Sequence, residues 1–90
     1  MIKNDLVDVA NFAYLPVEIG NLLFCVEERS KQSKGQDKDD DFFEERTSDG
    51  DVVAKYHVWH HMSLYPPFGI NEGWQKFNLY EQVIASGKKG

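Results

Sequence analysis

Three histidines lie close together in the run AKYHVWHHMSLY, residues 54–65. Imidazole nitrogens bind metals and exchange protons near neutral pH, so this run could form a metal site or a proton relay. On a helix, His57 and His61 would share one face at a spacing that suits zinc. The β-branched and aromatic residues around them instead favour a strand, which would separate their Cα atoms by about 13 Å. With no HExxH pattern and a single thiol, Cys25, we expect ordinary strand histidines and no metal.

His60 falls on the other face of the same predicted strand. There it is expected to be a core or rim histidine, and burial beside an acid would make the fold sensitive to pH. A nucleophilic pair of Cys25 and His60 across adjacent strands is conceivable, but a reactive thiolate needs an electropositive setting and this chain is acidic. The glycines form no phosphate-binding motif. We therefore predict no catalytic residue, no cofactor and no enzymatic activity.

The strand that would hold these histidines runs from Val52 to about Leu64, and its side chains should alternate between two faces. The face expected to pack in the core carries Val52, Ala54, Tyr56, Val58, His60, Met62 and Leu64. The mixed face carries Val53, Lys55, His57, Trp59, His61, Ser63 and Tyr65. An exposed Trp59 would mark a binding surface, because tryptophan is enriched at interface hot spots, unless a second layer covers it.

Further elements follow from local patterns. Helical spacing of apolar residues predicts a short helix over residues 4–14, ending before Pro16. Short apolar runs predict strands over 21–29 and 42–47, and the Asp-Gly pair in SDGD predicts a turn before the third strand. The YPPFG segment should end that strand, because proline cannot continue a central ladder.

Residues 71–86 are ambiguous. Asn71 could cap a helix with Trp74, Phe77, Tyr80 and Ile84 on one side, and Gly87 would suit the position just past its end. The alternative is a strand, in which apolar residues alternate at Phe77, Leu79, Val83 and Ala85 but are interrupted by Glu81. We favour the helix.

The net charge of −5 resides in one segment. Residues 27–51 contain ten acids and five bases, whereas the rest of the chain has five of each. Residues 30–41 contain no apolar side chain, so they gain too little by burial to order themselves and are predicted to form a flexible acidic loop. The loop could be a solvated hairpin tip that aids solubility, or an acidic surface that docks on a basic protein.

The docking interpretation names a specific set of residues. An aromatic pair within an acid cluster is typical of an interface anchor surrounded by steering charges. The predicted partner-binding residues are Asp37, Asp39, Asp40, Asp41, Phe42, Phe43, Glu44, Glu45 and Trp59. Direct nucleic-acid binding is not expected, because phosphates would be repelled and no basic stripe is present.

Taken together, the 90 residues predict one α+β domain. A three- or four-stranded antiparallel sheet would pack against one or two helices and carry a long acidic hairpin loop, with a frayed tail at 87–90. One unpaired cysteine, no signal peptide and no apolar run of about 20 residues predict a cytoplasmic chain without a membrane span.

In length, acidity and lack of a catalytic motif, the chain is similar to many small phage-encoded or accessory proteins that bind and modulate a host protein. We expect a protein-binding module, such as an inhibitor, whose partner has a basic surface; imitation of nucleic-acid phosphates is a special case. The alternatives are a homo-oligomeric structural protein and, less favoured, a histidine-based metal- or ligand-binding protein.

Overall fold

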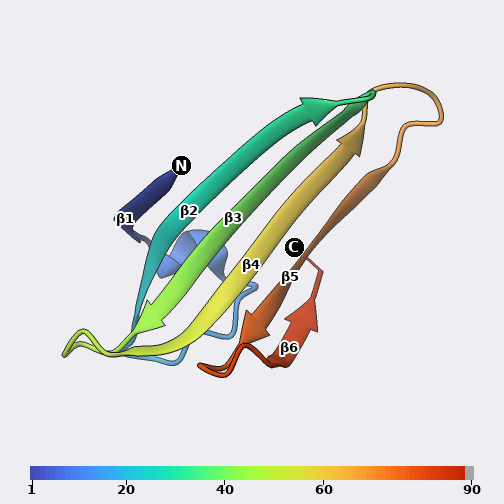
Figure 1. Cartoon of the computed structure of the whole chain (residues 1–90). Helices are drawn as coiled ribbons and strands as arrows, with labels where there is room; N and C mark the ends of the chain where they lie inside the picture. Colours follow the sequence, from blue (N-terminus) through green and yellow to red (C-terminus); the bar gives the residue numbers. More distant parts are fainter. Residues whose placement is uncertain (89–90) are drawn as a thin grey trace.

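The computed structural model describes residues 1–88 and consists of one antiparallel sheet (Figure 1). Its strands are β1 Ile2–Val7, β2 Leu22–Ser33, β3 Gln36–Arg46, β4 Val52–Ser63, β5 Ile70–Phe77 and β6 Val83–Gly87. They pair in the order β1-β2-β3-β4-β5-β6, so each strand lies beside its neighbour in the sequence. The long β2, β3 and β4 give the molecule an elongated shape of 47 × 26 × 24 Å.

The predicted α+β class is wrong, because residues 1–88 contain no α-helix and six strands rather than three or four. The segment predicted as a helix over 4–14 divides into β1 and a single 3-10 turn, η1 Val9–Phe12. Asp8 caps this turn by accepting a hydrogen bond from the Ala10 amide at 2.9 Å. Asp8 therefore caps a turn after a strand, whereas Asp5 lies within β1 and contacts Lys3 at 3.1 Å.

The helix favoured over 71–86 is also wrong, and Asn78 explains why. Its side-chain oxygen accepts hydrogen bonds from the amides of Tyr80 and Gln82 at 2.9 and 3.0 Å. Such a side-chain contact stabilises a tight turn, which here reverses the chain between β5 and β6. Glu81 completes the turn with a positive φ of 62°.

The long acidic hairpin loop is replaced by two paired strands. Residues 30–33 end β2 and residues 36–41 begin β3, and only Lys34 and Gly35 connect them. Both connecting residues have positive φ, 51° and 77°, as a two-residue hairpin turn that matches strand twist requires. Polar residues over 30–41 are tolerated because the backbone hydrogen bonds of a ladder, not side-chain burial, order them.

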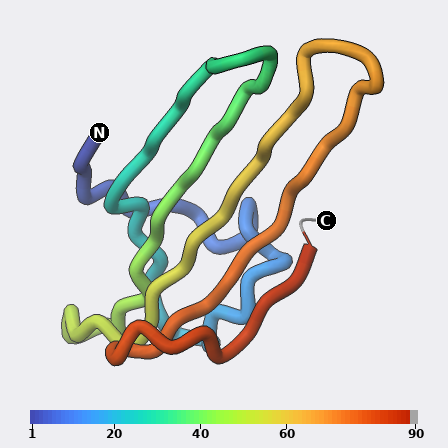
Figure 2. The backbone as a smooth tube through the Cα atoms, turned by 45° about the vertical axis from the view of Figure 1, so that its right-hand side comes forward, coloured from blue at the N-terminus to red at the C-terminus, as the bar shows by residue number. Residues whose placement is uncertain are grey.

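The core lies on one face of the sheet, called here the covered face. Its buried apolar side chains are Leu15, Leu23, Cys25, Phe43, Ala54, Tyr56, Val58 and Trp74. Residues 8–21 cross this face near its middle and lower part, and Val9, Phe12, Tyr14 and Val17 pack against the core (Figures 1 and 2). The predicted inward face of β4 is confirmed at Ala54, Tyr56 and Val58.

Within residues 1–88 no helix has the length and apolar character needed to cross a bilayer. Of the predicted frayed tail at 87–90, Gly87 belongs to β6, whereas residues 89–90 lie outside the described part of the chain.

Candidate functional site

Strand alternation gives the half of the sheet near the β2–β3 turn two chemically different faces. The face opposite the core, called here the open face, carries Glu27, Arg29, Lys31, Lys38, Asp40, Phe42, His57, Trp59 and His61. On the covered face, beyond the segment 8–21, lies an acidic patch of Glu28, Asp37, Asp39, Asp41 and Glu72. By the period-two geometry of a strand, the bases of β2 and β3 in this half all project from the open face, together with the acids Glu27 and Asp40, whereas the acids of the patch project from the covered face.

The predicted docking residues are therefore not one surface. Asp37, Asp39 and Asp41 lie in the acidic patch, whereas Asp40, Phe42, Glu44 and Trp59 project from the opposite, open face. Phe43 and Glu45 are buried, with exposed fractions of 2% and 1%, and no partner can reach them without unfolding the core. The expected combination of acids with Phe43 and Trp59 is thus divided among both faces and the core.

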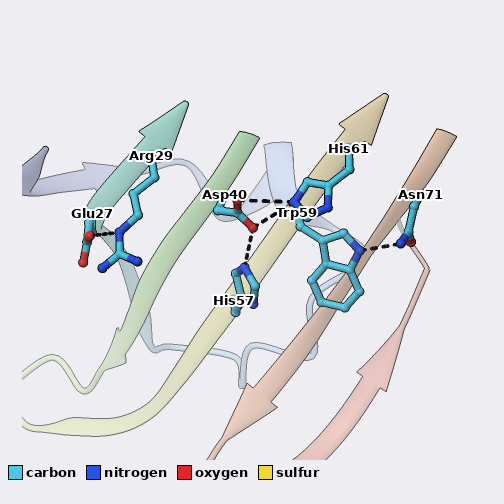
Figure 3. A network of polar contacts seen from close by, with 7 residues as sticks. All are labelled: Glu27, Arg29, Asp40, His57, Trp59, His61 and Asn71. Carbon is cyan, nitrogen blue, oxygen red and sulfur yellow. Dashed lines mark hydrogen bonds and ion pairs between the residues drawn. The ribbon is translucent and has the colours of Figure 1, made fainter. Parts of the chain in front are cut away.

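On the open face, Asp40 joins two of the three histidines (Figure 3). Its Oδ1 atom lies 2.8 Å from Nε2 of His57 and 3.1 Å from Nε2 of His61. Asp40 pairs with Trp59, which lies midway between the two histidines on β4, so its carboxylate can reach both rings. An ionised carboxylate only accepts hydrogen bonds, so both Nε2 atoms act as donors.

This bridge shifts the titration of Asp40. Partial burial alone would raise its pKa, but the hydrogen bonds and charges of His57 and His61 outweigh burial and hold the pKa below the ordinary aspartate value. The carboxylate therefore remains charged at neutral pH and orients both rings. Sequence spacing along β4 correctly separates the two histidines, but it misses the carboxylate on β3 that connects them.

Stacked rings surround the bridge. The Phe42 ring lies parallel to the His57 ring, with centroids 4.7 Å apart and an interplanar angle of 4°, and the Arg29 guanidinium lies 5.2 Å from the Phe42 centroid. The Trp59 indole lies against Gly73 and its Nε1 donates to the Asn71 Oδ1 at 3.3 Å. Phe42 is thus already in contact with two neighbouring side chains, so it is not a free anchor for a partner.

The acidic patch contains a hollow of about 370 Å³ whose lining includes Glu28, Ser30, Asp39, Asp41 and His60. Glu28 contacts Lys3 at 2.7 Å, and Asp39 accepts a hydrogen bond from the Ser30 hydroxyl at 2.7 Å.

The third histidine, His60, belongs to the same face, where its Nδ1 lies 2.8 Å from the Glu72 carboxylate. Burial, together with the negative charges of Asp41 and Glu72, raises the pKa of Tyr14, so the field of the patch reaches the segment that covers the core.

Glu45 forms a separate, buried network that holds the covering segment on the sheet. Its carboxylate accepts hydrogen bonds from the Tyr56 hydroxyl at 2.6 Å, from the Asn21 amide at 2.7 Å and from the Glu18 backbone amide at 3.2 Å. Burial would raise the pKa of Glu45, but these hydrogen bonds and Lys76 outweigh it and lower the pKa. The role of Glu45 is structural, because its hydrogen bonds tie β3 and β4 to residues 18–21.

The metal site and the nucleophilic pair considered for the histidines and the thiol find no support in the geometry of residues 1–88. No group of three or more His, Cys, Asp or Glu side chains within residues 1–88 is arranged to hold a metal ion. Cys25 is buried on the covered face, and burial is the main cause that raises the pKa of its thiol. A thiol in this state is a poor nucleophile.

Comparison with known proteins adds no functional information: no protein-family model, no curated protein and no solved structure matches this chain.

Proposed function

We propose that this chain is a small cytoplasmic, non-enzymatic protein-binding module that docks through its acidic patch on a basic surface of a protein partner. The observation that carries the proposal is the sorting of charge in the sheet. The five carboxylates of Glu28, Asp37, Asp39, Asp41 and Glu72 project from one face, while Arg29, Lys31 and Lys38 of the same strands project from the other.

Two features of the patch suit it to a basic partner. Glu28 and Asp41 lie directly opposite one another on β2 and β3. Lys3 contacts Glu28 at 2.7 Å, so the edge of the patch already accommodates a cationic side chain. The hollow beside them offers room for such a side chain, and the surrounding field would steer the encounter.

The experiment is a pull-down from the source cells with three baits. The first is the wild-type chain, and the second changes Asp37, Asp39 and Asp41 to Asn. The third is a control with the same net charge, in which the exposed residues Asp5, Asp49 and Asp51, outside the patch, become Asn. We expect a partner that the wild type and the control retain, that the patch variant loses, and that dissociates as salt rises from about 50 to 500 mM.

Equal recovery by all three baits, or binding that salt does not weaken, would refute the proposal. If the retained partner is a nucleic-acid-binding protein and an oligonucleotide competes with the chain for it, the partner belongs to the special case of phosphate imitation.

A further inference from the structure

The open face carries a row of side chains, called here the cationic row, that was not among the binding residues predicted from the sequence. Lys31 on β2 lies directly opposite Lys38 on β3, and Lys38 in turn lies directly opposite His61 on β4. Two lysines in one cross-strand pair repel, so this row lowers the stability of the hairpin unless an anionic surface covers it. Arg29 lies in the next row of the same face, where it contacts Glu27.

We infer that the cationic row of the open face docks on the acidic patch of a second copy of this chain. The inference rests on the proposed function, because it names one basic surface that the patch would recognise. Charge complementarity identifies the occupant: the row presents the ammonium groups of Lys31 and Lys38, and the patch presents five carboxylates. The row contains a like-charge cross-strand pair, Lys31 and Lys38, whose repulsion contact with carboxylates would relieve.

The two surfaces also match in position. The row spans β2, β3 and β4, the patch lies on β2, β3 and β5, and both are in the half of the sheet near the β2–β3 turn. Asp37 and Asp39 flank Lys38 one residue away along β3, about 3.3 Å. Stacking one copy on the next, face to face at about 10 Å as in packed sheets, therefore brings carboxylates near lysines. Residues 8–21 pass over the middle and lower part of the covered face (Figures 1 and 2), and the patch residues Glu28 and Asp39 are exposed.

This contact joins two different surfaces, so it is heterologous: each copy keeps one free surface of each kind. Successive copies would add to both ends, and the product is a concentration-dependent series of oligomers, not a closed dimer. Because the contact is electrostatic, raising salt from about 50 to 500 mM should weaken it by about tenfold or more.

Two charge-reversed variants test the inference by sedimentation velocity. Lys31→Glu with Lys38→Glu removes the cationic row but replaces one like-charge pair by another, so the cost to the hairpin should be unchanged. Asp37→Lys with Asp39→Lys replaces the two patch carboxylates that flank Lys38 by ammonium groups. We expect the wild type to form salt-sensitive oligomers, each variant alone to be monomeric, and an equimolar mixture to form salt-sensitive oligomers again.

The mixture restores association because the row retained by one variant meets the patch retained by the other, and the two altered surfaces are also opposite in charge. A wild type that is monomeric at all concentrations, or variants that stay monomeric when mixed, would overturn the inference. If the wild type is monomeric but still captures a basic protein partner through Asp37, Asp39 and Asp41, the self-association is refuted and the proposed function stands. If the wild type is monomeric and changing these three residues does not affect the captured proteins, both are refuted. Far-UV circular dichroism confirms that each variant is folded.

Discussion

Replacing Tyr56 by Phe should reveal how strongly the buried carboxylate holds the covering segment on the sheet. The Tyr56 hydroxyl is buried and donates a 2.6 Å hydrogen bond to the ionised Glu45. Hydrogen bonds to charged groups contribute about 1.5–3 kcal/mol, and the phenylalanine variant leaves the carboxylate with one donor fewer. A chain of this length has a total free energy of unfolding of roughly 5–13 kcal/mol, so the loss would be a large fraction of it.

The assay is thermal and urea unfolding at pH 7, followed by far-UV circular dichroism. At about 4–8 °C per kcal/mol for a domain of this size, Tm should fall by about 6–24 °C. Tyr14→Phe is the matched control, because Tyr14 packs against the same core, whereas the hydrogen bonds to the Glu45 carboxylate come from Glu18, Asn21 and Tyr56. Equal stability losses in the two variants would refute the reasoning that Glu45 depends on the Tyr56 hydroxyl.

Three further outcomes are expected. Gly73→Ala should destabilise the sheet by about 1–3 kcal/mol in thermal unfolding and change tryptophan fluorescence, because the new Cβ would lie 2.8 Å from the Trp59 indole and 2.9 Å from the Gly87 carbonyl oxygen on β6. Gly69→Ala is the control: its Cβ meets no atom within 4 Å, so its effect on thermal unfolding should be close to zero. Phe43→Ala should cost about 3–5 kcal/mol in urea unfolding, and Phe42→Ala clearly less, because the former ring is buried and the latter only half-buried; similar costs would contradict the assignment of the two faces. Glu45→Gln should reduce the fall in the free energy of unfolding at acid pH. The lowered pKa of Glu45 in the folded state stabilises the fold above the ordinary glutamate pKa of about 4, and this contribution is lost as pH falls through the folded-state pKa. A variant whose free energy of unfolding falls as steeply below about pH 4 as that of the wild type would exclude Glu45 as a cause.

The strand with a clear alternating pattern was predicted correctly, whereas both predicted helices were wrong. Alternation from Val52 to Leu64 predicts β4 and its inward residues, because half-buried strands must place apolar side chains on one face. Residues 71–86 fit a helical and an extended pattern almost equally well. The turn that decides between them depends on a side-chain hydrogen bond of Asn78, which no count of apolar residues detects.

The acidic segment was misjudged for a different reason. Low apolar content predicts disorder when side-chain burial must offset the loss of entropy. Here residues 30–41 are the ends of two long strands whose other halves are buried, so a ladder that begins in the core continues outward to the Lys34–Gly35 turn. That Lys-Gly pair is a weaker hairpin signal than Asn-Gly or Asp-Gly.

The sequence by itself determined where the surplus negative charge lies and that successive side chains in each strand point in opposite directions, because both follow from composition and local geometry. Only the tertiary structure decided which direction is inward. Register between β2 and β3 shifts between Cys25 and Glu27, and this pairing, together with the covering segment, buries Phe43 and Glu45 while Phe42 and Asp40 face outward. A one-residue change in pairing exchanges the two faces of a strand, so the acidic patch, the cationic row and the bridge from Asp40 to His57 and His61 exist only once all the strands have found their partners.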